Sequence, residues 1–251
     1  MEHRKGNPLS APAACTEPLC GGATEFYQRH ARPDFIEACY SAAPPRIQQA
    51  LAEELALLAR ALDPPGAVLE VGCGNGWVLD ALREHTRWMV GIDFPEPYVR
   101  QARRRVPLRA AQFVVARAGR LPFADGSFDY VLCVQNTLGV MGEDKNLAVA
   151  EAGRVLRPGG KMIFVVYSEL SAVARAEWYS QAHRQGLMAP IDWARSHAEL
   201  LVTADGHASE CFRAERLRSL FTAQGLSPRL ERLGDLYWVA AVVKDGVQHP
   251  V

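Results

Sequence analysis

The chain has 251 residues, of which 49% are hydrophobic and 22% are charged, and its 28 basic side chains balance 28 acidic ones. This length fits one large α/β domain or two small ones, and the composition is too apolar for a disordered chain. A net charge of zero argues against a surface built mainly to bind nucleic acid or an anionic membrane, and no run approaches the roughly 20 apolar residues that span a bilayer.

The first residues are predicted to be a mobile leader, residues 1–23, because they are rich in Pro, Ala, Gly and Cys and show no periodicity. Prolines at 8 and 12 interrupt any signal-peptide core, and Ala13-Ala14-Cys15 lacks the apolar run of a lipoprotein signal. The six cysteines are too scattered for a disulfide framework, and Cys15 and Cys20 have no convincing zinc-site spacing with Cys39 or Cys211. We therefore expect a reduced, cytoplasmic protein.

Residues 24–65 are predicted to form N-terminal helices. Segment 24–43 carries aromatic residues and is expected to hold one or two short helices broken at Pro33. A longer amphipathic helix opens at Pro44-Pro45 and ends at 63–66, with an apolar stripe formed by Ile47, Leu51, Leu55, Leu58 and Leu62.

From residue 66 onward, short apolar runs alternate with helical windows. The runs are 67–71, 88–92, 112–116, 128–134 and 162–167, and the windows are 76–85, 96–105 and 143–156. A helix at 213–224 and two extended segments, 226–233 and 235–243, complete the pattern. This alternation predicts an α/β core over 66–167 and 211–244, with a parallel sheet covered on both faces by helices.

Residues 168–210 do not fit this alternation and are predicted to form a cap over the substrate. They follow the carboxyl end of the fifth predicted strand, on the side where open α/β sheets bind ligands. His183, near Trp178 and Tyr179, is the candidate catalytic base. His197 and His207 are expected to be solvated or to cap local structure.

The most informative motif is the loop Glu70-Val71-Gly72-Cys73-Gly74-Asn75-Gly76, which follows the first predicted strand. Its glycines allow a tight turn and close approach of a ligand, and Asp93 at the end of the next strand can accept from both hydroxyls of a ribose. Loop and acid together indicate a nucleoside-containing cofactor. Glu70 would repel a pyrophosphate but suits a cation, and Trp77 replaces the third glycine of a dinucleotide fingerprint, so the pattern favours S-adenosylmethionine over NAD.

These motifs resemble the class I S-adenosylmethionine-dependent methyltransferases, most closely the small-molecule branch typified by ubiquinone- and menaquinone-biosynthesis enzymes. The resemblance rests on four segments in the family's order, namely 70–76, 91–93, 121–129 and 154–160. It implies a Rossmann-like, seven-stranded, mostly parallel sheet that ends in an antiparallel hairpin.

The resemblance also assigns cofactor contacts. Glu70 would bind the methionine amino group, Asp93 the ribose, and Phe94 would stack on adenine. The remaining assignments place Gly72, Cys73 and Gly74 beneath the cofactor, Ala118 at the adenine ring, and the backbone of Gln135 at the amino-acid moiety. The family usually has Asp where this chain has Arg117, and Arg117 cannot accept a hydrogen bond, so adenine must be held mainly by stacking and backbone groups.

The function implied is metal-independent, in-line transfer of the methyl group to an N, O or C nucleophile of a small molecule, with S-adenosylhomocysteine as product. Candidate acceptor contacts are Tyr27, Asn136, Tyr167, Trp178 and Trp193. A non-catalytic regulator that binds the cofactor or its product, and a nicotinamide-dependent oxidoreductase, are the alternatives.

No nucleic-acid or membrane partner is expected. The Arg103–Arg105 run suits the last turn of a helix, and Gln135-Asn136-Thr137-Leu138 stands where base-amine methyltransferases carry Asn/Asp-Pro-Pro-aromatic. The sequence does not define the oligomeric state.

Overall fold

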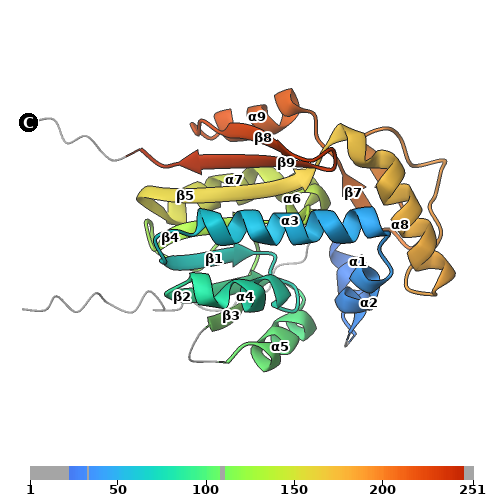
Figure 1. Ribbon diagram of the computed structural model, residues 1–251, viewed down its shortest axis with the longest axis horizontal. Coiled ribbons are helices and arrows are strands. Elements are labelled where there is room, and N and C mark those ends of the chain that lie inside the picture. The colour runs from blue at the N-terminus through green and yellow to red at the C-terminus, as the bar shows by residue number, and fades with distance from the viewer. Residues whose placement is uncertain (1–22, 33, 108–110, 246–251) are drawn as a thin grey trace, which may run out of the picture.

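The computed structural model describes residues 23–32, 34–107 and 111–245, and its centre is a seven-stranded sheet (Figure 1). Neighbouring strands lie in the order β3, β2, β1, β4, β5, β9, β8. β1 to β5 pair in parallel, whereas β9 is antiparallel to both β5 and β8. The bounds are β1 Ala67–Val71, β2 Trp88–Asp93, β3 Ala111–Val115, β4 Phe128–Cys133, β5 Leu156–Tyr167, β8 Arg229–Leu233 and β9 Tyr237–Val243. The predicted fold class is confirmed.

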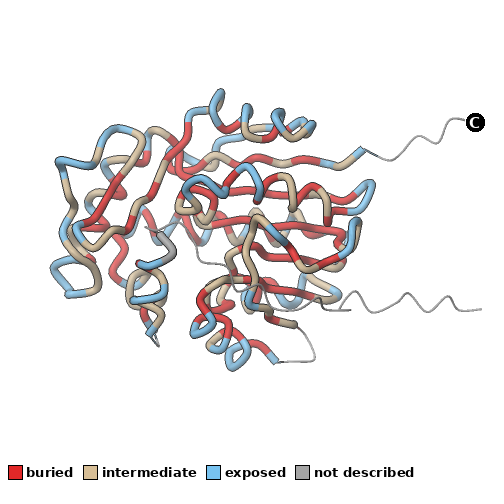
Figure 2. Tube along the Cα trace, turned by 180° about the vertical axis from the view of Figure 1, so that it is seen from behind, coloured by how far each residue is buried: buried red, intermediate tan, exposed pale blue. Residues whose placement is uncertain are grey.

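Helices cover both faces of the sheet, and successive strand residues alternate between them. In β1, Val68 belongs to the apolar cluster that includes α3 (Pro45–Ala61), α4 (Trp77–Leu82) and α5 (Glu96–Arg105). Its neighbour Leu69 belongs to the cluster on the opposite face, which includes α7 (Lys145–Val155) and α9 (Ala214–Thr222). Strands covered on both faces need nearly continuous apolar runs, which is why β1, β2 and β4 are buried almost throughout (Figure 2).

Element ends differ from the sequence prediction in several places. α4 stops at Leu82 and continues as a 3-10 turn, Arg83–His85. The predicted helix over 143–156 is α7, and it follows the short helix α6 (Thr137–Val140) and a 3-10 turn, Gly142–Asp144. β5 begins at Leu156 rather than at Met162, because Leu156 pairs with Phe128 before a register shift at the Pro-Gly-Gly segment.

Two segments that are distant in sequence lie together beyond the carboxyl ends of the strands (Figure 1). One comprises α1 (Ala23–His30) and α2 (Phe35–Ser41), and the other is residues 168–210, here named the cap. The cap consists of a 3-10 turn, Glu169–Ser171, the helix α8 (Ala172–Arg184) and the hairpin of β6 (Leu200–Val202) and β7 (Ala208–Glu210). Trp178 Nε1 donates to the Cys39 carbonyl at 2.7 Å, and Arg29 donates to the Asp205 carbonyl at 2.7 Å, so the two segments are joined by hydrogen bonds.

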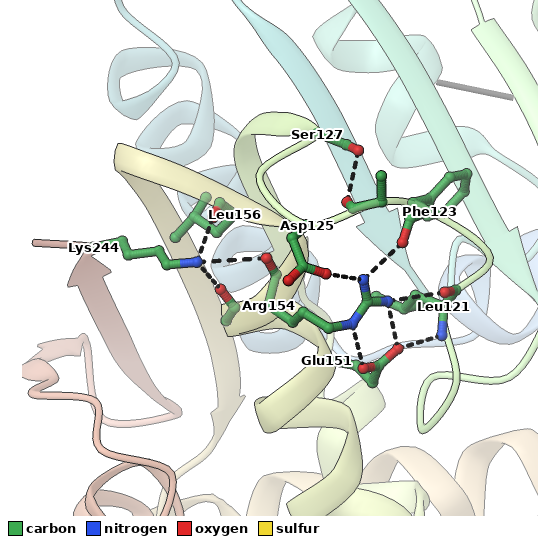
Figure 3. Close-up of polar contacts among 10 residues, drawn as sticks. Leu121, Phe123, Asp125, Ser127, Glu151, Arg154, Leu156 and Lys244 are labelled. Atoms are coloured by element: carbon green, nitrogen blue, oxygen red, sulfur yellow. Dashed lines mark hydrogen bonds and ion pairs between the residues drawn. The ribbon is translucent and has the colours of Figure 1, made fainter. Parts of the chain in front are cut away.

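Arg154 explains two of the sequence motifs in structural terms (Figure 3). Its guanidinium donates to the carbonyls of Leu121 (3.0 Å) and Phe123 (2.7 Å) and forms ion pairs with Glu151 and Asp125. Lys244 donates to the carbonyls of Gly153 and Leu156 at the end of α7, both at 2.7 Å. The segments 121–129 and 154–160 therefore fasten the loop before β4 to the end of α7.

Candidate active site

The glycine loop between β1 and α4 is tightly packed against the loop that follows β4. Gly72, Gly74 and Gly76 have φ values of 76°, 51° and 80°, a region that side chains with a Cβ rarely adopt. A Cβ on Gly72 would lie 2.2 Å from Thr137 Cγ2, and a Cβ on Gly74 would lie 2.8 Å from Ile36 Cδ1. Glycine is thus required both by the backbone conformation and by the close approach of neighbouring side chains.

Asp93 lies beside this loop, as the sequence predicts for an acid at the end of β2. Its Oδ2 accepts from the Gly74 amide at 2.7 Å and its Oδ1 accepts from the Phe94 amide at 2.8 Å. Burial raises the pKa of Asp93 to about 6, although both backbone hydrogen bonds oppose that rise. The carboxylate therefore fixes the glycine loop against the end of β2.

Two further carboxyl groups are buried nearby without a cationic partner among the described residues. Glu70 is almost fully buried, its Oε2 has no hydrogen-bond partner, and burial together with the charges of Asp93 and Glu54 raises its pKa well above the usual value. Glu54 of α3 is 0% exposed; its Oε1 accepts from the Gln135 amide at 2.9 Å and its Oε2 has no partner. Burial raises the pKa of Glu54 to about 8. Unpaired buried acids of this kind suit a cationic ligand group.

The sequence prediction missed Glu54, although a signal was present. Glu54 lies on the same helix face as Ile47, Leu51 and Leu58, all of which are buried. A charged residue within an apolar stripe indicates either a buried polar network or a ligand site.

Gln135 connects the glycine-loop side of the site with a neighbouring cavity. Its Oε1 accepts from Tyr40 Oη at 2.7 Å and from Trp77 Nε1 at 3.1 Å, whereas its buried Nε2 has no partner. Its backbone has a φ of 54°, and its amide donates to Glu54. The predicted backbone contact to an amino-acid moiety therefore involves an amide that already has a protein acceptor here.

The cavity beside Gln135 has a volume of about 110 Å³ and mostly aromatic walls. It draws on α1 and α2, on the loop after β4, on the end of β5 and on the cap. Four of the predicted acceptor contacts, Tyr27, Asn136, Tyr167 and Trp178, are among its lining residues. Trp193 is not: its side chain belongs to the exposed large apolar residues, at 66% exposure.

Two histidines of the cap, His183 and His207, lie in different surroundings. His183 is exposed, its Nδ1 contacts the Met188 carbonyl at 3.0 Å, and it does not line the cavity. His207, expected to be solvated or to cap local structure, is buried in the cavity wall with its Nε2 3.0 Å from Tyr179 Oη. Burial and the nearby charge of Arg175 lower the pKa of His207 to about 4, so the ring is neutral at pH 7. Its Nδ1 has no partner.

Asn136 holds three segments together at the cavity wall. Its Nδ2 donates to Ser209 Oγ and to the Glu210 carbonyl, both at 3.1 Å, and its Oδ1 accepts from the Tyr167 amide at 2.9 Å. These bonds join the end of β4 to the end of β5 and to β7, so the side chain is engaged in positioning the cap.

At the predicted adenine end, Arg117 and Ala118 are half-buried after β3. Arg117 Nη1 lies 3.9 Å from Asp144 Oδ2, and its buried Nη2 has no partner. Phe94 is also half-buried and directly follows Asp93.

Across residues 23–32, 34–107 and 111–245, no group of three His, Cys, Asp or Glu side chains is arranged to hold a metal ion. Cys39, Cys73, Cys133 and Cys211 are free thiols, while Cys15 and Cys20 lie outside the described residues. Within the same ranges, no helix has the length and apolar character needed to cross a membrane.

Comparison with known proteins agrees with this geometry. Residues 69–164 match the family described as "Methyltransferase domain". The chain is 34% identical over 103 residues to the malonyl-[acyl-carrier protein] O-methyltransferase of Erwinia pyrifoliae, covering 41% of this chain and 37% of that protein. It is 36% identical over 110 residues to the demethylmenaquinone methyltransferase of Beutenbergia cavernae, covering 42% of each. The matched part is thus about two fifths of the length of these relatives.

The fold is also found in a solved structure, the 1,6-didemethyltoxoflavin-N1-methyltransferase of Burkholderia thailandensis with bound 1,6-didemethyltoxoflavin and S-adenosylhomocysteine. The two structures superimpose with a TM-score of 0.59 over 93% of this chain and 95% of that one, at 18% identity. Residues 69–164 therefore match a methyltransferase-domain family, and the chain has the fold of the class I S-adenosylmethionine-dependent methyltransferases.

Proposed function

We propose that this protein is an S-adenosylmethionine-dependent methyltransferase that acts on a small molecule. The observation that carries the proposal is Glu70, a buried carboxyl group without a cationic partner, placed beside a glycine loop that requires glycine at Gly72 and Gly74. A nicotinamide dinucleotide would place a pyrophosphate near this acid, which is electrostatically unfavourable. S-adenosylmethionine would place an ammonium there instead.

The residues present fit that cofactor. Glu70 and Glu54 would hold the ammonium, and Asp93 would bind the ribose while it fixes the Gly74 amide. Phe94 would stack on adenine, and the adenine ring would also meet the backbone at Ala118. Arg117 would limit adenine recognition to stacking and backbone contacts, because its guanidinium has no acceptor for the exocyclic amine.

The bound cofactor supplies a methyl group on a sulfonium sulfur, which is already an activated leaving group. When bound, it would offer this methyl carbon to an acceptor lone pair, and the electrons of the carbon–sulfur bond would remain on sulfur. No metal is required for this displacement. The task of the protein is to hold the nucleophile in line, and positioning of this kind can lower a barrier by about 7–11 kcal/mol.

The acceptor would bind in the aromatic cavity between the cap and α1–α2. Its proton would pass to His207 Nδ1, which is free to accept when His207 Nε2–H donates to Tyr179 Oη. We assign this role to His207 in place of His183. The relatives named for demethylmenaquinone and 1,6-didemethyltoxoflavin support a small-molecule acceptor.

The decisive experiment combines binding with turnover. Calorimetry should show binding of S-adenosylhomocysteine and none of NADP, and methyl-labelled S-adenosylmethionine should transfer label to at least one member of a panel of small phenols, aromatic amines and carboxylic acids. Tight NADP binding without S-adenosylhomocysteine binding would overturn the assignment. Binding of S-adenosylhomocysteine without any turnover would favour the regulatory alternative.

His207 can be tested against a matched residue of the same cap. His207→Ala should lower kcat while leaving the affinity for S-adenosylhomocysteine unchanged, and His183→Ala should affect neither quantity. Equal rates for His207→Ala and the wild type would assign catalysis to positioning alone.

A further inference from the structure

Arg175 of α8 is a buried cation that lacks an anionic partner. The residue is 0% exposed, and its Nε and Nη1 have no hydrogen-bond partner. Its Nη2 donates to the carbonyl and the hydroxyl of Ser209, the latter at 2.9 Å, and its guanidinium carbon lies 4.9 Å from the centre of the Tyr167 ring. Arginine stays protonated in proteins, so the charge cannot be removed by a pKa shift.

The acidic side chains near the cap already have other partners. Glu210 forms ion pairs with Lys145 and Arg216. Glu199 forms ion pairs with Arg213 and Arg216. Glu169 forms an ion pair with Arg232 and accepts a hydrogen bond from Trp238. Asp205 accepts from Thr203 and from the Ala189 amide. Cys211, which also lies near Arg175, has a pKa raised by burial and is a weak acceptor as a neutral thiol. The described part of the chain therefore supplies no anion to Arg175.

Arg175 lies directly behind the cavity wall. Both of its close partners, Tyr167 and Ser209, line the cavity, and so does His207, whose pKa the charge of Arg175 lowers. An unpaired buried charge costs several kcal/mol, and a bound anion would remove that cost. Glu70 directly precedes the glycine loop, whereas Glu54 accepts from Gln135 in the cavity wall, so buried acids and a buried cation border the same site.

We propose that the charge of Arg175, acting from behind the wall formed by Tyr167 and Ser209, selects a carboxylate on the methyl acceptor, and that the acceptor is a single-ring aromatic acid. The cavity volume of about 110 Å³ is below the roughly 150 Å³ of an engineered cavity that binds benzene, so the walls leave room for no more than one ring. A carboxylate is favoured over a phosphate because one guanidinium neutralises one negative charge, and a dianion would leave a buried excess. This inference rests on the proposed function, since it names the acceptor class of the same site.

The test compares acids with uncharged analogues of the same shape. The probes are salicylate, anthranilate and 4-hydroxybenzoate, each paired with its amide, and binding to protein saturated with S-adenosylhomocysteine is measured by calorimetry. The wild type should bind at least one acid roughly 10- to 100-fold more tightly than its amide, the range expected for hydrogen bonds to a charged group. Arg175→Met should bring the two affinities within about twofold of each other.

Two variants separate charge recognition from general damage. Arg213→Met removes an exposed arginine that pairs with Glu199, and it should keep the preference for the acid. Arg175→Lys keeps the charge in a different shape and should retain part of the preference. If Arg175→Met does not fold, the wild-type preference and the Arg175→Lys result still decide the question.

The outcomes distinguish this inference from the proposed function. If S-adenosylhomocysteine binds and no acid in the panel is preferred over its amide, or none binds, Arg175 is a structural residue and the inference is wrong. The inference is also wrong if Arg175→Met keeps the full preference. If S-adenosylhomocysteine itself does not bind, the proposed function fails.

Discussion

Replacement of Glu54 by glutamine tests the buried acid of α3. Among the acidic groups of this site, Glu54 should have the effect on the pH dependence of stability that is easiest to measure. Burial raises the pKa of Glu54 from 4.5 to about 8, so between these values the folded protein keeps a proton that the unfolded chain has lost. The free energy of unfolding of the wild type should therefore fall as the pH rises through this window. The side chain introduced by Glu54→Gln would remain neutral and would still accept from the Gln135 amide.

The magnitude follows from the size of the pKa shift. Each pH unit within the window costs about 1.4 kcal/mol, so a rise from about pH 5.5 to 7.5 removes about 2.7 kcal/mol from the wild type through this group. For a chain of this size, 1 kcal/mol corresponds to roughly 2–4 °C in Tm. The Tm of Glu54→Gln relative to wild type should therefore rise by roughly 5–11 °C across that interval. Contributions from Glu70 and Asp93 are present in both proteins and largely cancel.

The assay is thermal unfolding followed by circular dichroism at three pH values, with no ligand added. Glu53→Gln is the matched control, because Glu53 is the neighbouring, partly exposed acid on the same helix and accepts from Gln49. Its Tm should follow that of the wild type at every pH. Parallel curves for Glu54→Gln and the wild type would refute the reasoning, because they would mean that Glu54 titrates as it does in water.

Three further predictions concern the cofactor loop. Gly72→Ala should destabilise the protein and abolish S-adenosylhomocysteine binding, because the added Cβ would lie 2.2 Å from Thr137 Cγ2. Adding Thr137→Ser removes that methyl group and should restore part of the lost Tm in a thermal melt. Asp93→Ala should weaken S-adenosylhomocysteine binding by about 1–3 kcal/mol in calorimetry, since ribose hydroxyls and the Gly74 amide lose their acceptor, and an unchanged Kd would place the ribose elsewhere. Arg117→Asp should leave that Kd unchanged or lower it by supplying an acceptor for adenine, whereas a large loss of affinity in the same titration would show that Arg117 itself contacts the cofactor.

The sheet and the loop could be predicted from sequence because both depend on local signals. The buried strands appear as apolar runs, and Gly72 and Gly74 mark backbone with positive φ. The position of Asp93 beside the glycine loop could be predicted because neighbouring parallel strands end at the same edge of the sheet. The Gly74 amide donates to Asp93 there.

The cap side chains could not be placed in the same way. His207 is buried because Phe26 packs against it, with the two ring centres 4.7 Å apart. The two residues are far apart in sequence, so no local sequence pattern predicts this contact. His183 follows Trp178 closely in sequence, but the turn of α8 directs it outward to solvent. Glu54 cannot be found from the apolar stripe of α3, because that stripe is defined by apolar residues and Glu54 is a charged residue on the same buried face.

The cavity walls come mainly from segments outside the matched domain, and this affects how proteins of this fold can change their ligands. The matched methyltransferase domain ends at residue 164, and most of the aromatic wall comes from α1, α2 and the cap, which lie outside it. Substitutions, insertions or exchanges in those two segments can change what the cavity accepts while the glycine loop and Asp93 remain intact. Under the proposed function, the sites for the methyl donor and the methyl acceptor would lie on separate stretches of chain, and the second could change over evolutionary time without disturbing the first.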